Sequence, residues 1–173
     1  TLKSRLKGEA LFLRSFYYYN LAVLFGNIPL VLNETASVEE GNNHTQVGAS
    51  EVYSQIVADL IDAETALPGK SSATNGRATK GAALALLTKA HVYQGEWLEA
   101  QTNAELVVTS GEYSLSEDYR DIFVKSGENG PGSIFEIQRS PFGGGYWGSV
   151  NGANEGNLAV VYQLPRGQFG GWG

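Results

Sequence analysis

The sequence predicts a mainly α-helical fold of helix-turn-helix pairs, followed by an irregular segment. Apolar residues recur at helical spacing over residues 2–25 and 50–67. The same spacing runs from residue 81 to 110, with one interruption at a glycine turn. Residues 139–173 are rich in glycine and aromatic residues and support no long helix. The fold class is therefore mainly α, with a non-helical C-terminal region.

Residues 81–113 are the centre of this prediction. The first helix has alanine and leucine on most of its circumference, so we expect it to be buried among other helices. Thr79 is placed to cap it, and Gly95 allows the chain to reverse. A second helix is predicted over residues 98–110, with three small or apolar residues facing back: Ala100, Ala104 and Val107.

This pair resembles the helix-turn-helix unit of tetratricopeptide repeats. The resemblance rests on Thr88, Gly95, Trp97 and Ala100 at their spacing in that unit. It implies an α-α superhelix in which helix pairs stack. Trp97 is expected to fill the turn, and His91 to be buried and hydrogen-bonded without binding a ligand.

The first helix, residues 2–25, carries two apolar stripes, so we expect neighbours on two sides. A polar face is predicted to hold Arg14 and Tyr18, with Lys3 and Lys7. The aromatic residues of this helix are predicted to lie in the core: Phe12, Phe16, Tyr17 and Tyr19. The first stripe consists of Leu6, Ala10, Leu13, Tyr17, Leu21 and Leu24.

Residues 33–49 are polar and are predicted to form a surface loop. Ser50 is the predicted N-cap of the next helix, which runs to about Leu67. Asp59, Asp62 and Glu64 are predicted to form its solvated acidic face. The buried stripe of this helix is predicted to be Tyr53, Ile56, Leu60, Ala63 and Leu67.

The C-terminal part divides into a strand and an irregular segment. Residues 134–138 alternate and are β-branched, which predicts one short strand. We divide the chain into a helical region, residues 1–138, and a glycine- and aromatic-rich segment, residues 139–173. Because the chain starts at Thr1 and stops at Gly-Gly-Trp-Gly, we expect it to be part of a longer protein.

Composition excludes several classes of function. Eighteen acidic against 12 basic residues give a net charge of −6, which argues against binding nucleic acid. The chain has no cysteine and only two histidines, so we expect no metal site, and nothing in the sequence calls for a cofactor. No apolar run approaches the length of a membrane span.

Taken in order, these segments resemble the SusD/RagB family. The resemblance is carried by residues 9–21, EALFLRSFYYYNL, and by residues 24–31, LFGNIPLV. It continues through GRATKGAA at 76–83, the Gly95-Glu96-Trp97 turn, SGEYSL at 110–115 and IFEIQ at 134–138.

The resemblance implies a non-catalytic, lipid-anchored protein on the outer surface of Bacteroidetes cells. Such proteins capture glycans, or sometimes peptides, and pass them to a TonB-dependent, SusC-like outer-membrane transporter. By that resemblance the acylated N-terminal part and the C-terminal part lie outside this sequence. The expected location is the cell outer membrane.

The candidate glycan-binding residues lie in the irregular segment. Tyr146 and Trp147 are flanked by glycines and followed by Asn151, and Trp172 also lies among glycines. An aromatic ring covers the apolar face of a sugar, while asparagine bonds its hydroxyl groups. The alternative is that these rings pack against the helices or against further chain.

Two other functions stay open from the sequence. A tetratricopeptide-like superhelix is a scaffold that binds a peptide or partner protein. A glycoside hydrolase needs two carboxylates in a cleft, for which Glu136 and Glu155 are the only candidates.

Overall fold

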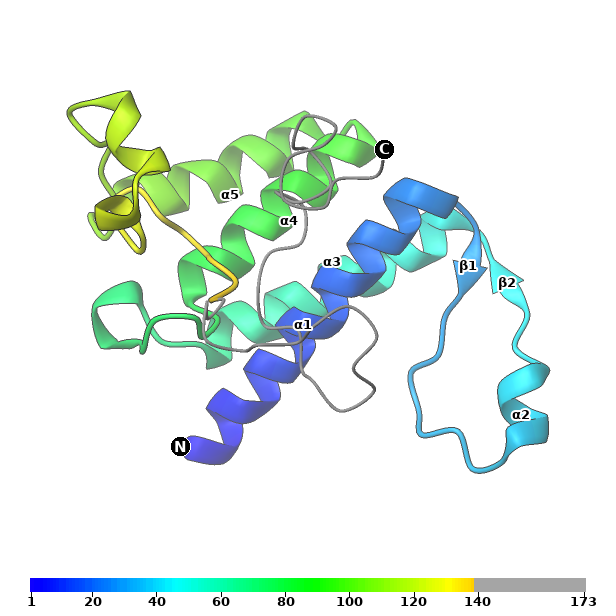
Figure 1. The fold of residues 1–173 in the computed structure, drawn as a ribbon. Coiled ribbons are helices and arrows are strands. Elements are labelled where there is room, and N and C mark those ends of the chain that lie inside the picture. Colours follow the sequence, from blue (N-terminus) through cyan, green and yellow to red (C-terminus); the bar gives the residue numbers. More distant parts are fainter. Residues whose placement is uncertain (139–173) are drawn as a thin grey trace, which may run out of the picture. The chain divides into compact units, whose positions relative to one another are not determined.

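The computed structural model describes residues 1–138, of which Thr1–Glu136 form one compact unit. Its long helices are α1 (Leu2–Phe25), α3 (Ala49–Ala66), α4 (Lys80–Gln94) and α5 (Trp97–Thr109). Each helix packs mainly on the next one along the chain, α1 on α3, α3 on α4 and α4 on α5 (Figure 1). This order is that of a stack of helical hairpins, and it confirms the predicted mainly α, tetratricopeptide-like fold.

The central helix is buried as predicted. Thr79 caps α4, its hydroxyl accepting a hydrogen bond from the Ala82 N–H (3.1 Å). Gly95 ends α4 in the left-handed conformation at φ 76°, which glycine adopts without strain. The buried residues of α4 are Gly81, Ala82, Ala83, Leu84, Leu86, Leu87, Ala90 and His91.

The core lies between α1, α3 and α4. Helices α1 and α3 approach closely at Gly8. A Cβ at this position would lie only 2.9 Å from the Ala66 Cβ, so glycine permits the close approach. Ser15 is fully buried at the same contact, its hydroxyl 3.4 Å from the Ile56 carbonyl. The predicted buried stripe of α3 is confirmed. The large core side chains are Phe12, Tyr19, Ile28, Val52, Tyr53, Ile56, Leu60, Leu67, Leu86 and Leu87.

The first predicted stripe of α1 is wrong. Tyr17 is 65% exposed and Leu24 is 73% exposed, and the other members are exposed as well. Within Thr1–Glu136, α3 covers the opposite face of α1, which carries Phe12 and Tyr19. Phe16 is half-buried, so of the four aromatic residues predicted as core only Tyr17 lies on the exposed face. The sequence of α1 contains two apolar stripes, and the position of α3 determines which of them is buried.

The predicted polar faces need two corrections. Asp59 is only 5% exposed and receives two hydrogen bonds from the Arg14 guanidinium, both at 2.7 Å, so neither residue lies on a solvated face. Gln55 Nε2 donates to the same carboxylate at 2.8 Å. This hydrogen-bonded pair raises the pKa of Arg14, and it joins α1 to α3. Asp62 is exposed, as predicted.

Between α1 and α3 the chain forms an arm, residues 27–48, which extends from the helices (Figure 1). Its base is a two-residue antiparallel ladder of β1 (Ile28–Pro29) and β2 (Gln46–Val47), with Ile28 opposite Val47. Its far part holds a short helix, α2 (Val38–Asn42), so the predicted surface loop is exposed but not irregular.

Side chains of the arm and of α1 close its base. The Tyr18 hydroxyl donates to the Val31 carbonyl (2.9 Å) and accepts from the Val31 N–H (2.7 Å). The Asn27 side-chain oxygen accepts from the Ala49 N–H (3.1 Å) at the start of α3. Ser50, the predicted N-cap, lies inside the first turn of α3, because the helix begins one residue earlier.

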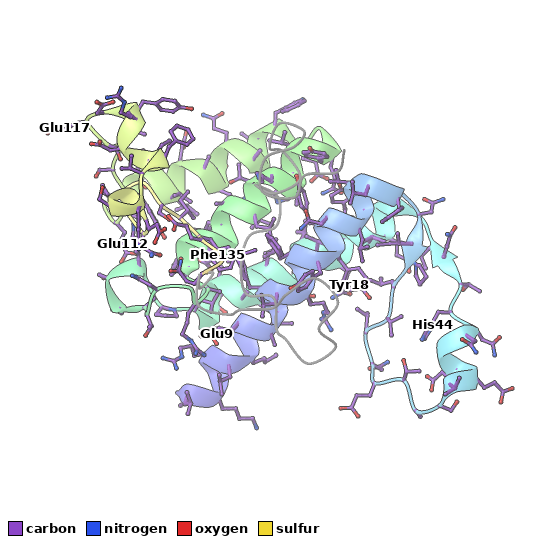
Figure 2. The ribbon with its side chains drawn as sticks, in the orientation of Figure 1. Glu9, Tyr18, His44, Glu112, Glu117 and Phe135 are labelled. Atoms are coloured by element: carbon purple, nitrogen blue, oxygen red, sulfur yellow. The ribbon has the colours of Figure 1, made fainter. Side chains whose placement is uncertain are left out.

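After α5 the chain is irregular, with 3₁₀ turns at Tyr119–Phe123 and Lys125–Gly127. The strand predicted at residues 134–138 is not formed. Instead, Phe135 packs its ring on Phe12 and Phe16, with centroid distances of 5.0 and 6.1 Å (Figure 2). The Phe135 side chain thus packs on α1, while the backbone of residues 134–138 pairs with no strand in the described residues.

Candidate functional site

The four predicted glycan-binding residues, Trp147, Tyr146, Trp172 and Asn151, lie outside the described residues, as does the whole predicted segment 139–173. The division into regions 1–138 and 139–173 therefore stays a prediction. Within Thr1–Glu136, the concave and polar features gather where the 67–79 loop meets the chain that follows α5.

Lys70 is the centre of this meeting point. It lies in a 3₁₀ turn, Lys70–Ser72, just after α3. Its Nζ donates to three backbone carbonyls, those of Gly130 (2.8 Å), Pro131 (3.1 Å) and Ser133 (2.9 Å). It also lies 5.0 Å from the centre of the Tyr113 ring, a cation–π contact. The ammonium thus fastens residues 130–133 to the helical hairpins.

Glu112 and Tyr113 are the two side chains fixed against this loop (Figure 2 labels Glu112). The Glu112 carboxylate accepts hydrogen bonds from the Lys70 N–H and from the Ser71 hydroxyl (3.2 Å). The Tyr113 hydroxyl lies 3.2 Å from the Thr79 hydroxyl. Burial raises the pKa of Tyr113 above its ordinary value.

Two glycines make room for these side chains. A Cβ on Gly69 would lie 2.3 Å from a Glu112 carboxylate oxygen, and a Cβ on Gly81 would lie 2.2 Å from the Tyr113 hydroxyl oxygen. No such contact is tolerated, so any larger residue at either position would displace its neighbour. This packing explains the glycines at 69 and 81, whereas Gly111, which precedes Glu112, is explained by its positive φ of 70°.

A pocket of about 370 Å³ opens between α4 and α5 beside Tyr113. Leu84, Leu106 and Val107 supply its apolar lining. An ion pair between Lys80 Nζ and Glu64 (2.7 Å) lies at the same pocket. The remaining lining residues are Gly69, Gly81, Thr109, Ser110, Glu112 and Tyr113. A wider hollow of about 580 Å³ lies on the other side of Glu112, along Asn75, Asn129 and Pro131.

The other residues considered from sequence have structural roles where they are described. His91 is buried, and its Nδ1 lies 2.6 Å from a Glu96 carboxylate oxygen, which confirms the prediction of a buried, hydrogen-bonded histidine. Trp97 is 68% exposed, so the prediction that it fills the turn is wrong, and the His91–Glu96 contact spans the turn instead. Glu136 accepts a hydrogen bond from the Asn129 N–H (3.0 Å), while Glu155 lies outside the described residues.

Sequence reasoning missed the Lys70, Glu112 and Tyr113 cluster. Lys70 and Glu112 are 42 positions apart, and no local pattern reports a contact at that separation. The usable signal was the pair of glycines that each precede a charged residue after a helix. Among residues 1–138 no three histidine, cysteine or acidic side chains are grouped to hold a metal ion. None of the described helices has the length and hydropathy needed to cross a bilayer.

The stacked hairpins and the hollows along the loops define a class of protein: a helical-repeat scaffold with irregular chain packed on it. Residues 1–93 match the family model SusD-like_3, described as starch-binding associating with outer membrane. The chain therefore belongs to the SusD-like family, as the sequence resemblance predicted.

Individual relatives agree. The curated SusD-like protein P2 of Formosa agariphila is 29% identical over 119 residues, which cover 67% of this chain and 23% of that protein. A solved SusD-like carbohydrate-binding protein from Bacteroides fragilis is 32% identical with a TM-score of 0.76, covering 80% of this chain and 28% of that one. A laminarin-binding SusD-like protein is also 32% identical, with a TM-score of 0.75, over 84% of this chain and 33% of that one. The chain thus spans about a quarter of the length of the curated relative.

Proposed function

We propose that this protein is a non-catalytic, cell-surface protein that captures a glycan for uptake through a TonB-dependent outer-membrane transporter. One observation carries the proposal: this chain is similar to a laminarin-binding SusD-like protein, at 32% identity and a TM-score of 0.75. Glycan binding by SusD-like proteins supports the ligand class. Delivery to a SusC-like transporter, and a lipid-anchored position at the outer membrane, belong to the proposal.

The glycan contacts are proposed to lie in residues 139–173. Trp147, Tyr146 and Trp172 supply rings for the C–H faces of sugars, and Asn151 supplies an amide for the hydroxyl groups. In most binding sites a few aromatic anchors carry most of the affinity. We therefore expect the loss of one of these rings to weaken binding strongly and to leave the helical hairpins folded.

Affinity electrophoresis tests this proposal. The protein is run in native gels cast with laminarin, starch or other polysaccharides, beside Trp147→Ala and Trp172→Ala. Trp97→Ala is the matched control, because Trp97 is exposed on α5 at the start of the second hairpin helix. Retardation by at least one glycan that is lost in Trp147→Ala or Trp172→Ala and kept in Trp97→Ala supports the proposal. No retardation by any glycan contradicts it.

The transporter and the location need their own experiment. The tagged protein is captured from detergent-solubilised outer membranes of the source bacterium, and its partners are identified by mass spectrometry. Labelling of intact cells with a membrane-impermeant reagent reports surface exposure. Recovery without any TonB-dependent transporter, or no surface labelling, would contradict this part of the proposal.

A second candidate is a peptide- or protein-binding scaffold. The observation in its favour lies at the start of α5, where the apolar side chain of Leu98 is 71% exposed. An apolar side chain exposed to this extent is available to contact a partner. Capture of peptides without retardation by any glycan would favour this scaffold over glycan capture, and Leu98→Ser should then reduce the capture.

A further inference from the structure

The pocket between α4 and α5 has the size and the lining of a small-ligand site. Its volume of about 370 Å³ falls within the range of roughly 300–1,000 Å³ that ligand pockets occupy. Leu84, Leu106, Val107 and the Tyr113 ring give it apolar surface, and hydroxyl, ammonium and carboxylate groups surround that surface. All of these residues belong to the unit Thr1–Glu136, and none is among the glycan-binding residues predicted at 146–172.

The walls of this pocket are held in place before any ligand enters. Tyr113 is fixed at its hydroxyl by Thr79 and on its ring by the Lys70 ammonium. Glu112 is fixed by the Lys70 N–H and the Ser71 hydroxyl. Binding to such a site costs little ordering of side chains, which favours affinity for a small, flexible ligand.

The polar groups at the pocket determine the kind of ligand. Thr109 and Ser110 donate their hydroxyl protons to backbone carbonyls of α5, both at 2.7 Å. The Ser110 oxygen already accepts a hydrogen bond from the Glu112 N–H (3.2 Å), so the Thr109 oxygen is the freer acceptor of the two. Glu64 and Glu112 are further acceptors, and Lys80 is the one ammonium donor among the described lining residues. A surface rich in acceptors suits a ligand with many hydroxyl donors.

The charges at the pocket indicate whether the ligand is a neutral or an anionic sugar. The described lining residues include two carboxylates, Glu64 and Glu112, and one ammonium, Lys80. Lys80 pairs with Glu64 at 2.7 Å, which leaves Glu112 as the remaining lining charge, while the Lys70 ammonium lies 5.0 Å from the centre of the Tyr113 ring. An anionic sugar, such as a uronic acid or a sulfated residue, would be repelled there. An uncharged sugar ring places its C–H face on the leucines and tyrosine and its hydroxyl groups against the acceptors.

We propose that the α4–α5 pocket binds one neutral sugar residue of the captured glycan, as a subsite built from residues other than the aromatic residues predicted at 146–172. This inference rests on the proposed function, since it assumes that a glycan is the ligand. It assigns specificity for uncharged sugars to Glu64, Lys80 and Glu112, and the apolar contact to Leu106 and Tyr113.

Filling the pocket tests the proposal. Leu106→Trp places a large ring at the pocket from α5, where Leu106 is 49% exposed and can be replaced without entering the core. Val108→Trp is the matched control, since Val108 is 76% exposed on the same helix and does not line the pocket. Urea unfolding of both variants establishes that they are folded.

Binding is measured by titration calorimetry with laminarihexaose, a neutral hexasaccharide, and with maltohexaose and a hexameric oligogalacturonate. We expect Leu106→Trp to weaken binding of the neutral ligand by about tenfold or more, equivalent to about 1.4 kcal/mol, and Val108→Trp to leave it unchanged. Oligogalacturonate should not compete with the neutral ligand.

The outcomes separate the two proposals. Unchanged affinity of Leu106→Trp, with binding still lost in Trp147→Ala, overturns the pocket subsite and leaves glycan capture standing. Equal competition by oligogalacturonate overturns the specificity for neutral sugars. No binding of any of the three oligosaccharides by the unaltered protein counts against glycan capture itself, and the subsite falls with it.

Discussion

The ion pair between Arg14 and Asp59 gives the sharpest prediction about stability. Asp59 is 5% exposed and receives both guanidinium hydrogen bonds at 2.7 Å. Its replacement by alanine leaves the Arg14 guanidinium, whose side chain is 31% exposed, against the core without its anion. The unfolded chain hydrates both groups, so the loss falls entirely on the folded state.

The size of the effect follows from the geometry. Removing one partner of a buried ion pair costs about 3–5 kcal/mol, because the other charge stays buried and uncompensated. Arg14 is partly exposed and can recover some water, so we expect the lower end, about 3 kcal/mol, for Asp59→Ala. For a chain of this size that lowers the melting temperature by roughly 6–12 °C. Replacing both residues, as in Arg14→Met with Asp59→Leu, should cost about 1 kcal/mol or less, since no charge is left unpaired.

Urea unfolding followed by circular dichroism measures these free energies. Asp62→Ala is the control, because Asp62 lies exposed on the same helix, and it should change stability by less than about 0.5 kcal/mol. In a double-mutant cycle built from the single variants Arg14→Met and Asp59→Leu, the coupling between the two positions should exceed about 1.5 kcal/mol. Additive single mutants, or an Asp59→Ala as stable as Asp62→Ala, would refute the assignment of a buried, paired charge.

Three further predictions concern other parts of the molecule. Gly81→Ala should destabilise by about 1–3 kcal/mol, because its Cβ would meet Tyr113, and Tyr113→Ala in the same chain should remove most of the added cost in urea unfolding. The pKa of Tyr19 is raised from its ordinary 10.0, first by burial and then by the Tyr93 hydroxyl. The neutral side chain therefore stabilises the folded protein fully below pH 10, and this stabilisation is lost as the pH rises further. We expect the stability of Tyr19→Phe to fall less above pH 10 than that of the unaltered protein. Lys70→Met should lose the three hydrogen bonds to carbonyls and lower the free energy of unfolding by about 1–2 kcal/mol. It should also speed amide hydrogen exchange at Ser114, whose N–H donates to the Pro131 carbonyl (3.3 Å). Unchanged exchange at Ser114 would contradict the role of the ammonium in holding residues 130–133.

The sequence was sufficient to predict the helices. Periodicity and turn residues are local, so α1 was placed at its observed bounds, and Thr79 and Gly95 were identified as the ends of α4. The missed element, α2, had its own local signal: Ser37 and Glu40 are spaced as in a capping box, and the Ser37 hydroxyl accepts from the Glu40 N–H (3.1 Å).

Which helix face is buried could not be predicted as well. On α1 the exposed stripe with Leu13 and Tyr17 is as apolar as the buried one with Phe12 and Tyr19, and only the position of α3 decides between them. The same applies to Asp59, which looks like any helical surface acid until Arg14 is brought opposite to it from 45 positions away. Long-range partners are a property of the packing, which periodicity does not report.

The candidate site also contains contacts that the sequence does not predict and residues whose role stays a prediction. The cluster around Lys70 joins residues 70, 112 and 130–133, and its hydrogen bonds go largely to backbone carbonyls, which every residue type carries. Apart from the two glycines that precede Lys70 and Glu112, no pattern of residue types therefore points to it. The aromatic residues Tyr146, Trp147 and Trp172 stay a prediction, as do the domain division at residue 138 and the binding role of Asn151.

The Tyr18 hydroxyl has a consequence for how this protein tolerates change. One oxygen atom satisfies both the N–H and the carbonyl of Val31, the two groups that a neighbouring strand would otherwise pair. The backbone of Val31, shortly after the end of α1, is thus hydrogen-bonded by a side chain of α1 itself, next to the short ladder of β1 and β2. Insertions or deletions further out, around α2, can lengthen or shorten the excursion while the hairpin stack keeps its register, so this is where diversity among homologues can accumulate without cost to the scaffold.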